Sequence, residues 1–311
     1  MSHIIWDRLG NVGNFVEPFA GSLAVLLGRP HAPKTETVND LDGFICNAWR
    51  AIQYAPHEVA HYCDWPVSES DMHAKHHYLN AARAELTQRL EGNYEYFDAK
   101  LAGFWIWGAC LWIGSGWCSE KGPWRVVDGL LKRVGRSEGE SGVQRKLPHL
   151  GDAGRGVAKA SLSSNDALYE WMDNLSSRLR RVRIACGDWT RVLGPSVTFT
   201  HGMTGIFLDP PYGHSERRGD IYAHDNDVAQ DVLAWCVENG SNPLLRICLA
   251  GYDGEHNALE GMGWERVGWK AHGGYGNKGK EGRGRENAAR ESLWFSPACL
   301  KPDAGLFGGQ L

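Results

Sequence analysis

The stretch "NFVEPFAGSLAVLLGRP", residues 14–30, decides the fold. It begins with apolar residues that suit a buried strand, turns at Pro18 and Gly21, and continues with leucines at helical spacing until Pro30 ends the helix. The stretch "TETVNDLDGFICNAWRAIQ", residues 35–53, repeats the order of strand, turn and helix. Alternating strands and helices predict a parallel sheet whose ligands bind at the carboxyl ends of the strands.

The same alternation returns in the second half of the chain. The strand patterns "VRIAC", "GIFL", "LLRICLAG", "WERVGWKA" and "ESLWFS" are separated by helical patterns such as "DALYEWMDNLSSRL". Between the halves lie a predicted helix over 74–89, a tryptophan-rich stretch that we expect to form a core, and a long basic, glycine-rich stretch. We therefore predict one doubly wound α/β domain from residues 1–60 and 165–311, interrupted by a mainly helical and irregular insertion, residues 61–164.

The composition is that of an ordinary soluble globular protein, with 42% hydrophobic and 23% charged residues and a net charge of −4 over 311 residues. The N-terminus lacks a signal-peptide pattern and no apolar run approaches the ~18 residues of a membrane span, so we expect a cytoplasmic protein. Eight cysteines without a CxxC pair suit buried free thiols. His73 and His77 share a helical face without further ligands, so we expect no metal site.

Acidic residues follow three of the predicted strands: Glu17, Asp40 and Asp188. No GxGxxG pattern, which cradles a pyrophosphate, follows the first strand. Asp40 stands where a carboxylate binds ribose hydroxyls, although capping the next helix would suit Asp40 or Asp42 equally. We expect Asp188 to accept from an adenine amino group, with Trp189 beside the ring. The pattern predicts a nucleoside cofactor without phosphates, which S-adenosylmethionine is and NAD is not.

The strand "GIFL" runs into "DPPY", residues 209–212. Pro210 and Pro211 stiffen the backbone, and Asp209, before a proline, takes an extended conformation. An aromatic amine is a poor nucleophile because its lone pair is delocalised. Acceptors on both its hydrogens, Asp209 and the carbonyl of Pro210, would direct the lone pair to a methyl group while Tyr212 stacks on the base. A lone "DPPY" also suits a tight turn, but beside the other strand-end acids it predicts methylation of an exocyclic amine.

The chain resembles the Dam-like, alpha-class adenine-N6-specific DNA methyltransferases over residues 1–60 and 165–297. Four stretches carry this resemblance and occur in this order: "FVEPFAGSLAVLL", "VNDLDGFICNAW", "IACGDW" and "IFLDPPY". The resemblance implies a Rossmann-like methyltransferase sheet that binds S-adenosylmethionine and releases S-adenosylhomocysteine, with Asp209 in both the catalytic and the cofactor site. The family's lysine-containing N-terminal segment has no match here, and Trp6 and Asn11 are the candidates to replace it. Besides the acids and Trp189, the implied cofactor contacts are Pro18, Phe19, Ala20, Gly21, Ser22 and Leu41.

The resemblance also implies that residues 61–164 form the target recognition domain and that an adenine leaves the duplex to be methylated. Two basic stretches are the candidate contacts with double-stranded DNA. Their candidate residues are Gln144, Arg145, Lys146, Arg155, Lys278, Lys280 and Arg283. We expect a bacterial or phage-encoded monomer without a membrane partner. A cognate restriction endonuclease is compatible with this activity but not required.

Other functions remain open from the motifs alone. Cytosine-N4 methylation needs the same activation of an exocyclic amine, so "DPPY" does not exclude it. RNA methyltransferases also carry such turns, but a long recognition insertion favours duplex DNA. A non-catalytic relative that binds DNA or cofactor is an alternative of another class. The strand-end acids and Tyr212 are all present, which favours an active enzyme.

Overall fold

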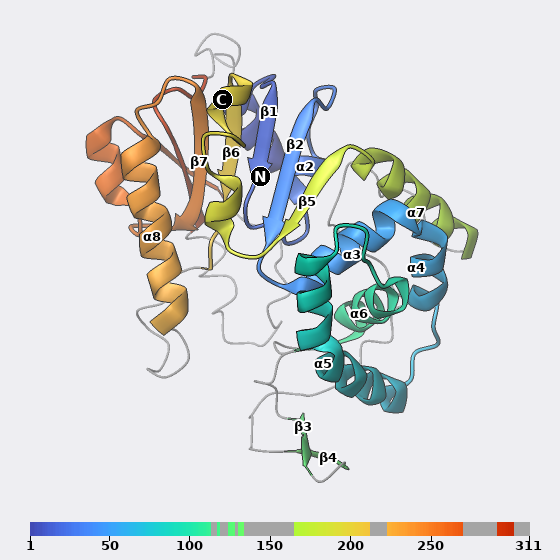
Figure 1. The fold of residues 1–311 in the computed structure, drawn as a ribbon. Helices are drawn as coiled ribbons and strands as arrows, with labels where there is room; N and C mark the ends of the chain where they lie inside the picture. Colours follow the sequence, from blue (N-terminus) through green and yellow to red (C-terminus); the bar gives the residue numbers. More distant parts are fainter. Residues whose placement is uncertain are drawn as a thin grey trace, which may run out of the picture. The chain divides into compact units, whose positions relative to one another are not determined.

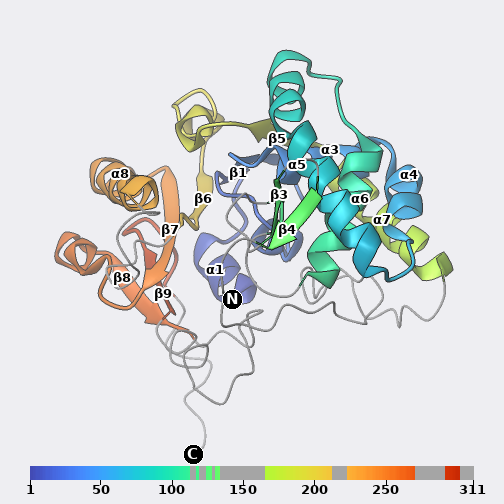
Figure 2. The ribbon, with the colours of Figure 1, turned by 90° about the horizontal axis from the view of Figure 1, so that it is seen from below.

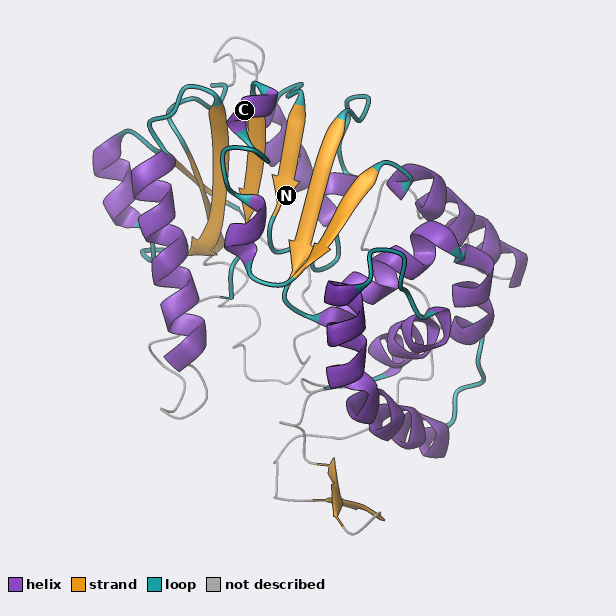
Figure 3. Cartoon of the chain, viewed as in Figure 1, coloured by secondary structure: helices purple, strands orange, loops and turns teal. Residues whose placement is uncertain are grey.

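The computed structural model describes residues 1–112, 117–118, 124–127, 130–133, 165–211, 223–269 and 291–301. They form an α/β fold with a seven-stranded sheet and a separate two-stranded sheet (Figures 1 and 3). The strands are β1 (Asn14–Glu17), β2 (Thr35–Asp40), β3 (Trp124–Val127), β4 (Leu130–Arg133), β5 (Val182–Cys186), β6 (Thr204–Leu208), β7 (Leu245–Tyr252), β8 (Glu265–Gly268) and β9 (Glu291–Phe295). The α-helices are α1 (Ser2–Leu9), α2 (Ala24–Leu27), α3 (Gly43–Tyr54), α4 (Pro56–Cys63), α5 (Glu69–Gly92), α6 (Ala99–Leu111), α7 (Asn165–Leu179) and α8 (Ala223–Asn239). The 3₁₀ helices are η1 (Trp189–Val192), η2 (Phe199–His201) and η3 (Asn257–Met262).

Two helices begin at residues other than those that periodicity predicts. The hydroxyl of Ser68 accepts from the N–H of Asp71 at 3.2 Å, so α5 begins at Glu69, earlier than the predicted start at residue 74. Leu23, predicted within the first helix, instead precedes it with a left-handed φ of 54°. The helix α2 is therefore a single turn that begins at Ala24.

The large sheet has the strand order β5-β2-β1-β6-β7-β9-β8. Strand β1 pairs in parallel with both β2 and β6, and Asn14 lies opposite Thr35 on one side and Thr204 on the other. Strand β7 continues the parallel set beside β6, whereas β9 runs antiparallel to both β7 and β8. The strand order reverses between β1 and β6, which makes their carboxyl ends the topological switch point of a doubly wound sheet. The predicted Rossmann-like fold class is confirmed.

The chain divides into two compact units, one formed by Met1–Val38 with Trp189–Leu311 and the other by Asn39–Asp188. In the first unit, α1 and α8 lie on opposite sides of β7 (Figure 2). The second unit contains helices α3 to α7 together with β5 and the end of β2. Within the part of the chain that the structure describes, no helix has both the length and the apolar character needed to cross a membrane.

A buried ion pair ties together the beginning of the first unit. Arg29 Nη1 lies 3.1 Å from Glu36 Oε1, and the two side chains are 0% and 2% exposed. Arg29 also donates to the carbonyl of Val12 at 2.6 Å, and its guanidinium lies 5.1 Å from the ring centre of Trp6. Trp6 in turn donates its indole N–H to the carbonyl of Val25 at 2.8 Å. These contacts link α1, the residues before β1, α2 and β2.

The second unit has a helical core. Helix α3 packs against α5, α6 and α7, and buried side chains such as Phe44, Leu79 and Leu101 meet between them. Trp107 is fully buried and donates its indole N–H to the carbonyl of Trp65 at 2.9 Å. The expectation that tryptophans of this region form a core is therefore confirmed at Trp107.

His76, which is uncharged, contacts Trp112 at the end of α6 and the backbone of Cys118. His76 stacks on Trp112 with ring centres 5.1 Å apart, and its Nδ1 accepts from the backbone N–H of Cys118 at 3.2 Å. Burial lowers the pKa of His76 to about 4, and the neighbouring His73 and His77 act in the same direction. The imidazole therefore stays uncharged near neutral pH and keeps Cys118 in place.

Removing one partner of the buried pair should be more damaging than removing both. The variant Glu36→Ala leaves the Arg29 guanidinium buried without its counter-ion, and we expect it to lose about 3–5 kcal/mol in the free energy of unfolding. The double variant Arg29→Met/Glu36→Leu removes both charges and should recover most of that loss. Urea unfolding measures both variants, and equal losses in the two would contradict a role for the pair.

Candidate functional site

The candidate site of the first unit lies at the carboxyl ends of β1 and β6. Glu17 is the last residue of β1, and Asp209 follows the last residue of β6. The two strands are parallel neighbours, with Val16 opposite Ile206, so both acids stand at the same edge of the sheet. Two acids predicted from separate motifs are thus brought together at the switch point.

The turn after β1 leaves its backbone open to a ligand. Gly21 has a φ of 45° and Leu23 a φ of 54°, and the N–H of Leu23 donates to the carbonyl of Ala20 at 2.8 Å. Pro18 and Ala20 are buried, whereas Gly21 and Ser22 are exposed. Apart from chain neighbours, no described atom comes within 4 Å of the place a Cβ on Gly21 would take. Glycine tolerates this left-handed conformation and lets a ligand approach the backbone closely.

Glu17 is a buried carboxyl group at this edge, only 2% exposed. Its Oε2 accepts from the backbone N–H of Leu26 in α2 at 3.2 Å. Burial raises the pKa of Glu17 well above its ordinary value; the bond from Leu26 opposes the rise, and the charges of Asp209 and Glu36 add to it. A positive charge at this edge would therefore lower the cost of ionising Glu17.

A further carboxyl group at this edge escaped the sequence analysis. Glu291 begins β9, which runs antiparallel to β7, and it lies opposite Tyr252 at the carboxyl end of β7. Burial raises the pKa of Glu291, and the charge of Asp209 raises it further. The reversed direction of one strand brings the first residue of "ESLWFS" to the edge where the parallel strands end. The glutamate at the start of the predicted strand "ESLWFS" was the sequence feature from which this site residue could have been predicted.

Two aromatic rings from the first unit stack on each other near its strand ends. The ring centres of Phe19 and Trp189 are 6.0 Å apart with an interplanar angle of 28°. Phe19 comes from the turn after Glu17, and Trp189 begins η1. Trp189 is buried and Phe19 half-buried, so the two rings pack on each other beside the turn after β1.

In the second unit, hydrogen bonds join the ends of β2 and β5. The backbone N–H of Gly187 donates to the carbonyl of Asp40 at 2.9 Å, and the side chain of Asn39 donates to the carbonyl of Gly187, also at 2.9 Å. Asp40 and Asp188 therefore follow adjacent strand ends, where Asp40 is half-buried and Asp188 exposed. The structure brings these two predicted acids together within this unit.

The structure also separates the roles of Asp40 and Asp42, which the sequence left open. Asp42 is the N-cap of α3, since its Oδ1 accepts from the N–H of Phe44 at 2.9 Å. Asp40 makes a different contact, because its Oδ1 accepts from the N–H of Asp42 at 2.9 Å. Capping therefore belongs to Asp42. Leu41 between them is 70% exposed.

The remaining candidates lie in different settings. Trp6 is 1% exposed and its indole N–H is bonded to Val25, so it packs inside the first unit, whereas Asn11 is exposed. Pro210 is buried and Pro211 exposed. The candidates outside the described residues are Tyr212, Gln144, Arg145, Lys146, Arg155, Lys278, Lys280 and Arg283.

The eight cysteines, all of which the structure describes, form no disulfide, and all but Cys110 are buried. Among the described residues, no group of three or more histidine, cysteine, aspartate or glutamate side chains is arranged to hold a metal ion.

The variant Glu17→Gln should stabilise the fold in a pH-dependent way. Because folding raises the pKa of Glu17, the folded protein keeps a proton that the unfolded chain releases, and the carboxyl group destabilises the fold as pH rises. Glutamine retains an acceptor for Leu26 without this cost. We expect a gain of about 0.5–2 kcal/mol in the free energy of unfolding at about pH 8 and little at about pH 4.5. Denaturant unfolding at both pH values is the measurement, and a gain independent of pH would contradict the assignment.

Comparison with known proteins shows that part of this chain is similar to a known protein family. Residues 3–100 match the family model described as D12 class N6 adenine-specific DNA methyltransferase. A search of curated proteins finds no match. The matched residues include the turn after Glu17 and the acid Asp40, while Asp188 and Asp209 lie beyond them. The chain is thus similar, over residues 3–100, to the D12 class N6 adenine-specific DNA methyltransferases, a family of S-adenosylmethionine-dependent enzymes, and this similarity supports adenine-N6 DNA methylation as its activity.

Proposed function

We propose that this protein transfers a methyl group from S-adenosylmethionine to N6 of an adenine in double-stranded DNA. One observation carries the proposal: Glu17, Asp209 and Glu291 interact electrostatically at the switch-point edge of a chain that matches an adenine-specific DNA methyltransferase family. The family match supports adenine-N6 methylation as the reaction, and the acidic edge supports a positively charged cofactor.

The residues at this edge fit a positively charged nucleoside. The pKa values of Glu17 and Glu291 are raised partly by the charge of Asp209, so a phosphate would add repulsion whereas a cation would reduce it. S-adenosylmethionine, when bound, supplies an electrophilic methyl group on a positively charged sulfur. The exposed backbone at Gly21 gives the ligand a close approach to the chain.

The proposed cofactor contacts follow the strand ends. Asp40 accepts hydrogen bonds from the ribose hydroxyls, and the exposed Leu41 covers one face of the adenine ring. Asp188 accepts from the adenine amino group, and Trp189 packs beside the ring. The turn 18–22 faces the remainder of the cofactor.

Asp209 and the carbonyl of Pro210 are proposed to orient the target amine. They accept its two hydrogens, so that the nitrogen lone pair faces the methyl group instead of the purine ring. Pro210 and Pro211 lack N–H groups and restrict the backbone, which keeps both acceptors in place. Tyr212 stacks on the target base, and Asn11 is the proposed N-terminal contact with the methionine end of the cofactor.

DNA recognition is assigned to residues 61–164, with the catalytic domain formed by 1–60 and 165–311. The basic stretches 144–155 and 278–283 bind the DNA in this proposal. We further propose that the protein acts as a monomer in the cytoplasm of a bacterium, encoded there or by a phage. A partner restriction endonuclease is compatible with the activity but not required.

A label-transfer assay tests the function and the role of Asp209 together. The protein is incubated with duplex DNA and tritiated S-adenosylmethionine, and the DNA is digested to nucleosides. We expect label in N6-methyl-2′-deoxyadenosine; label in N4-methyl-2′-deoxycytidine would overturn the adenine assignment. Asp209→Ala should reduce transfer at least about 100-fold, while affinity for S-adenosylhomocysteine, whose sulfur is neutral, changes less than about threefold. Asp231→Ala, an exposed position on α8, is the matched control and should retain activity.

The acidic edge also predicts how cofactor affinity depends on pH. Between about pH 8 and about pH 5.5, which lies above the ordinary titration of glutamate, any negative charge that the edge loses as pH falls is lost first from the carboxyl groups with raised pKa, Glu17 and Glu291. We expect the affinity for S-adenosylmethionine, with its cationic sulfur, to fall more than that for S-adenosylhomocysteine, whose sulfur is neutral. Calorimetric titration of both ligands across this range gives the ratio, and a constant ratio would contradict the charge argument.

A further inference from the structure

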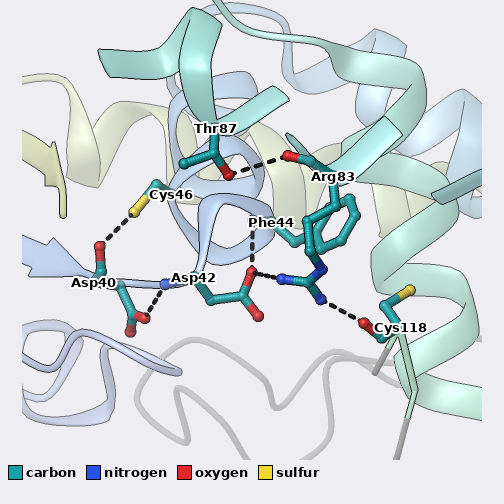
Figure 4. A network of polar contacts seen from close by, with 7 residues as sticks. All are labelled: Asp40, Asp42, Phe44, Cys46, Arg83, Thr87 and Cys118. Atoms are coloured by element: carbon teal, nitrogen blue, oxygen red, sulfur yellow. Dashed lines mark hydrogen bonds and ion pairs between the residues drawn. The ribbon is translucent and has the colours of Figure 1, made fainter. Parts of the chain in front are cut away.

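The loop of residues 40–42 in the second unit, here called the acid loop, is held by contacts on several sides (Figure 4). The Oδ1 of Asp40 accepts from the N–H of Asp42 at 2.9 Å, which closes the loop on itself. The carbonyl of Asp40 accepts from the thiol of Cys46 at 3.3 Å and from the N–H of Gly187 at 2.9 Å. The backbone of Asp40 is therefore fixed from α3 and from β5, and the position of its side chain depends on Asp42.

Asp42 is itself held by a residue far along the sequence. Its Oδ1 accepts both from the N–H of Phe44, as the cap of α3, and from Nη1 of Arg83 at 3.2 Å. Arg83 comes from α5, and its guanidinium also lies 4.6 Å from the ring centre of Phe44. One arginine thus contacts the cap and the first turn of α3 together.

The start of α3 and the middle of α5 approach each other closely at this point. A Cβ on Gly43 would stand 2.6 Å from the hydroxyl of Thr87, so only glycine fits there without displacement. That hydroxyl donates to the backbone carbonyl of Arg83 at 3.1 Å. The helix that carries Arg83 is therefore packed directly on the acid loop.

The other end of the guanidinium is occupied as well. Nη2 of Arg83 donates to the backbone carbonyl of Cys118, as Figure 4 shows. Cys118 has a left-handed φ of 53°, and its N–H is bonded to His76, so Cys118 is held by a second contact besides Arg83. A planar guanidinium reaches two such acceptors at once, which a single ammonium group does not.

We propose that Arg83 is a positioning residue for the ribose carboxylate: by holding Asp42 from α5, it fixes the acid loop that presents Asp40. The inference rests on the proposed function, because it takes Asp40 as the ribose contact. Arg83 lies in the predicted recognition insertion, so the residues that hold the cofactor depend on a side chain from that insertion. Arg83 itself need not touch the cofactor.

Binding measurements without DNA test the inference with two ligands. S-adenosylhomocysteine carries the ribose hydroxyls that Asp40 is proposed to bind, and its 2′,3′-dideoxyribose analogue lacks them. In calorimetric titrations, Arg83→Gln should weaken S-adenosylhomocysteine about fivefold and the analogue less than about twofold, as expected for loss of a partly exposed ion pair. Arg83→Lys should restore part of the difference. A role limited to packing would weaken both ligands alike.

Two further variants make the result decisive. Arg89→Gln removes another arginine of α5, which pairs with Glu85 at 3.4 Å away from the acid loop, and it should leave both affinities unchanged. Asp42→Asn keeps a cap oxygen for Phe44 but removes the charge that Arg83 meets. It should reproduce the ribose-dependent loss, with no further loss when combined with Arg83→Gln.

The outcomes distinguish failure of the proposed function from failure of the proposed role of Arg83. If the unaltered protein binds neither ligand, the proposed function fails. If it binds S-adenosylhomocysteine and Arg83→Gln binds both ligands as tightly as Arg89→Gln does, the proposed function stands and the role of Arg83 is overturned. Equal weakening of both ligands by Arg83→Gln overturns it too.

Discussion

Parallel pairing on both sides of β1 is the constraint on which the structure depends. All four residues of β1 are buried, and the strand is bonded to β2 and β6 in the same direction. A strand with parallel neighbours on both sides cannot be joined to them by hairpins, so each connection must cross a face of the sheet. The chain therefore leaves the neighbouring strands at a common edge. Residues distant in sequence, such as Glu17 and Asp209, meet there because of this pairing.

The two buried glutamates Glu36 and Glu17 of the first unit differ in how their burial is compensated. Glu36 faces the guanidinium of Arg29, a pairing that compensates its burial. Glu17 accepts a backbone N–H from Leu26, yet its pKa stays well above the ordinary value. A carboxyl group kept at such a cost, at the edge where a doubly wound sheet binds ligands, is typical of a functional position.

Much of this arrangement could be predicted from the sequence because periodicity and turn residues are local signals. The strands of the parallel set and the helices between them follow from apolar spacing, and the strand-end acids follow from the strands. Glu291 could not be found in this way, since its place depends on the antiparallel direction of β9, which no local pattern reveals. The left-handed Leu23 and the cap at Asp42 depend on backbone geometry that several residues would satisfy equally.

Long-range side-chain partners were the other part that could not be predicted. In the sequence, Arg83 is one of many polar residues in a predicted helix, and its partners Asp42 and Cys118 lie 41 and 35 positions away. Periodicity indicates which face of a helix is buried but not which loop that face will meet. Only the folded structure therefore shows the contacts of Arg83.

The shared guanidinium of Arg83 has a thermodynamic consequence. Because one side chain bonds both the acid loop and the carbonyl of Cys118, order imposed at either acceptor reduces the conformational entropy still to be lost at the other. Linkage makes this effect reciprocal: a ligand that fixes the acid loop favours binding events that fix Cys118, by the same factor in each direction. In the proposed function, in which Asp40 holds the ribose, a cofactor that fixes the acid loop would through this arginine also favour order at Cys118.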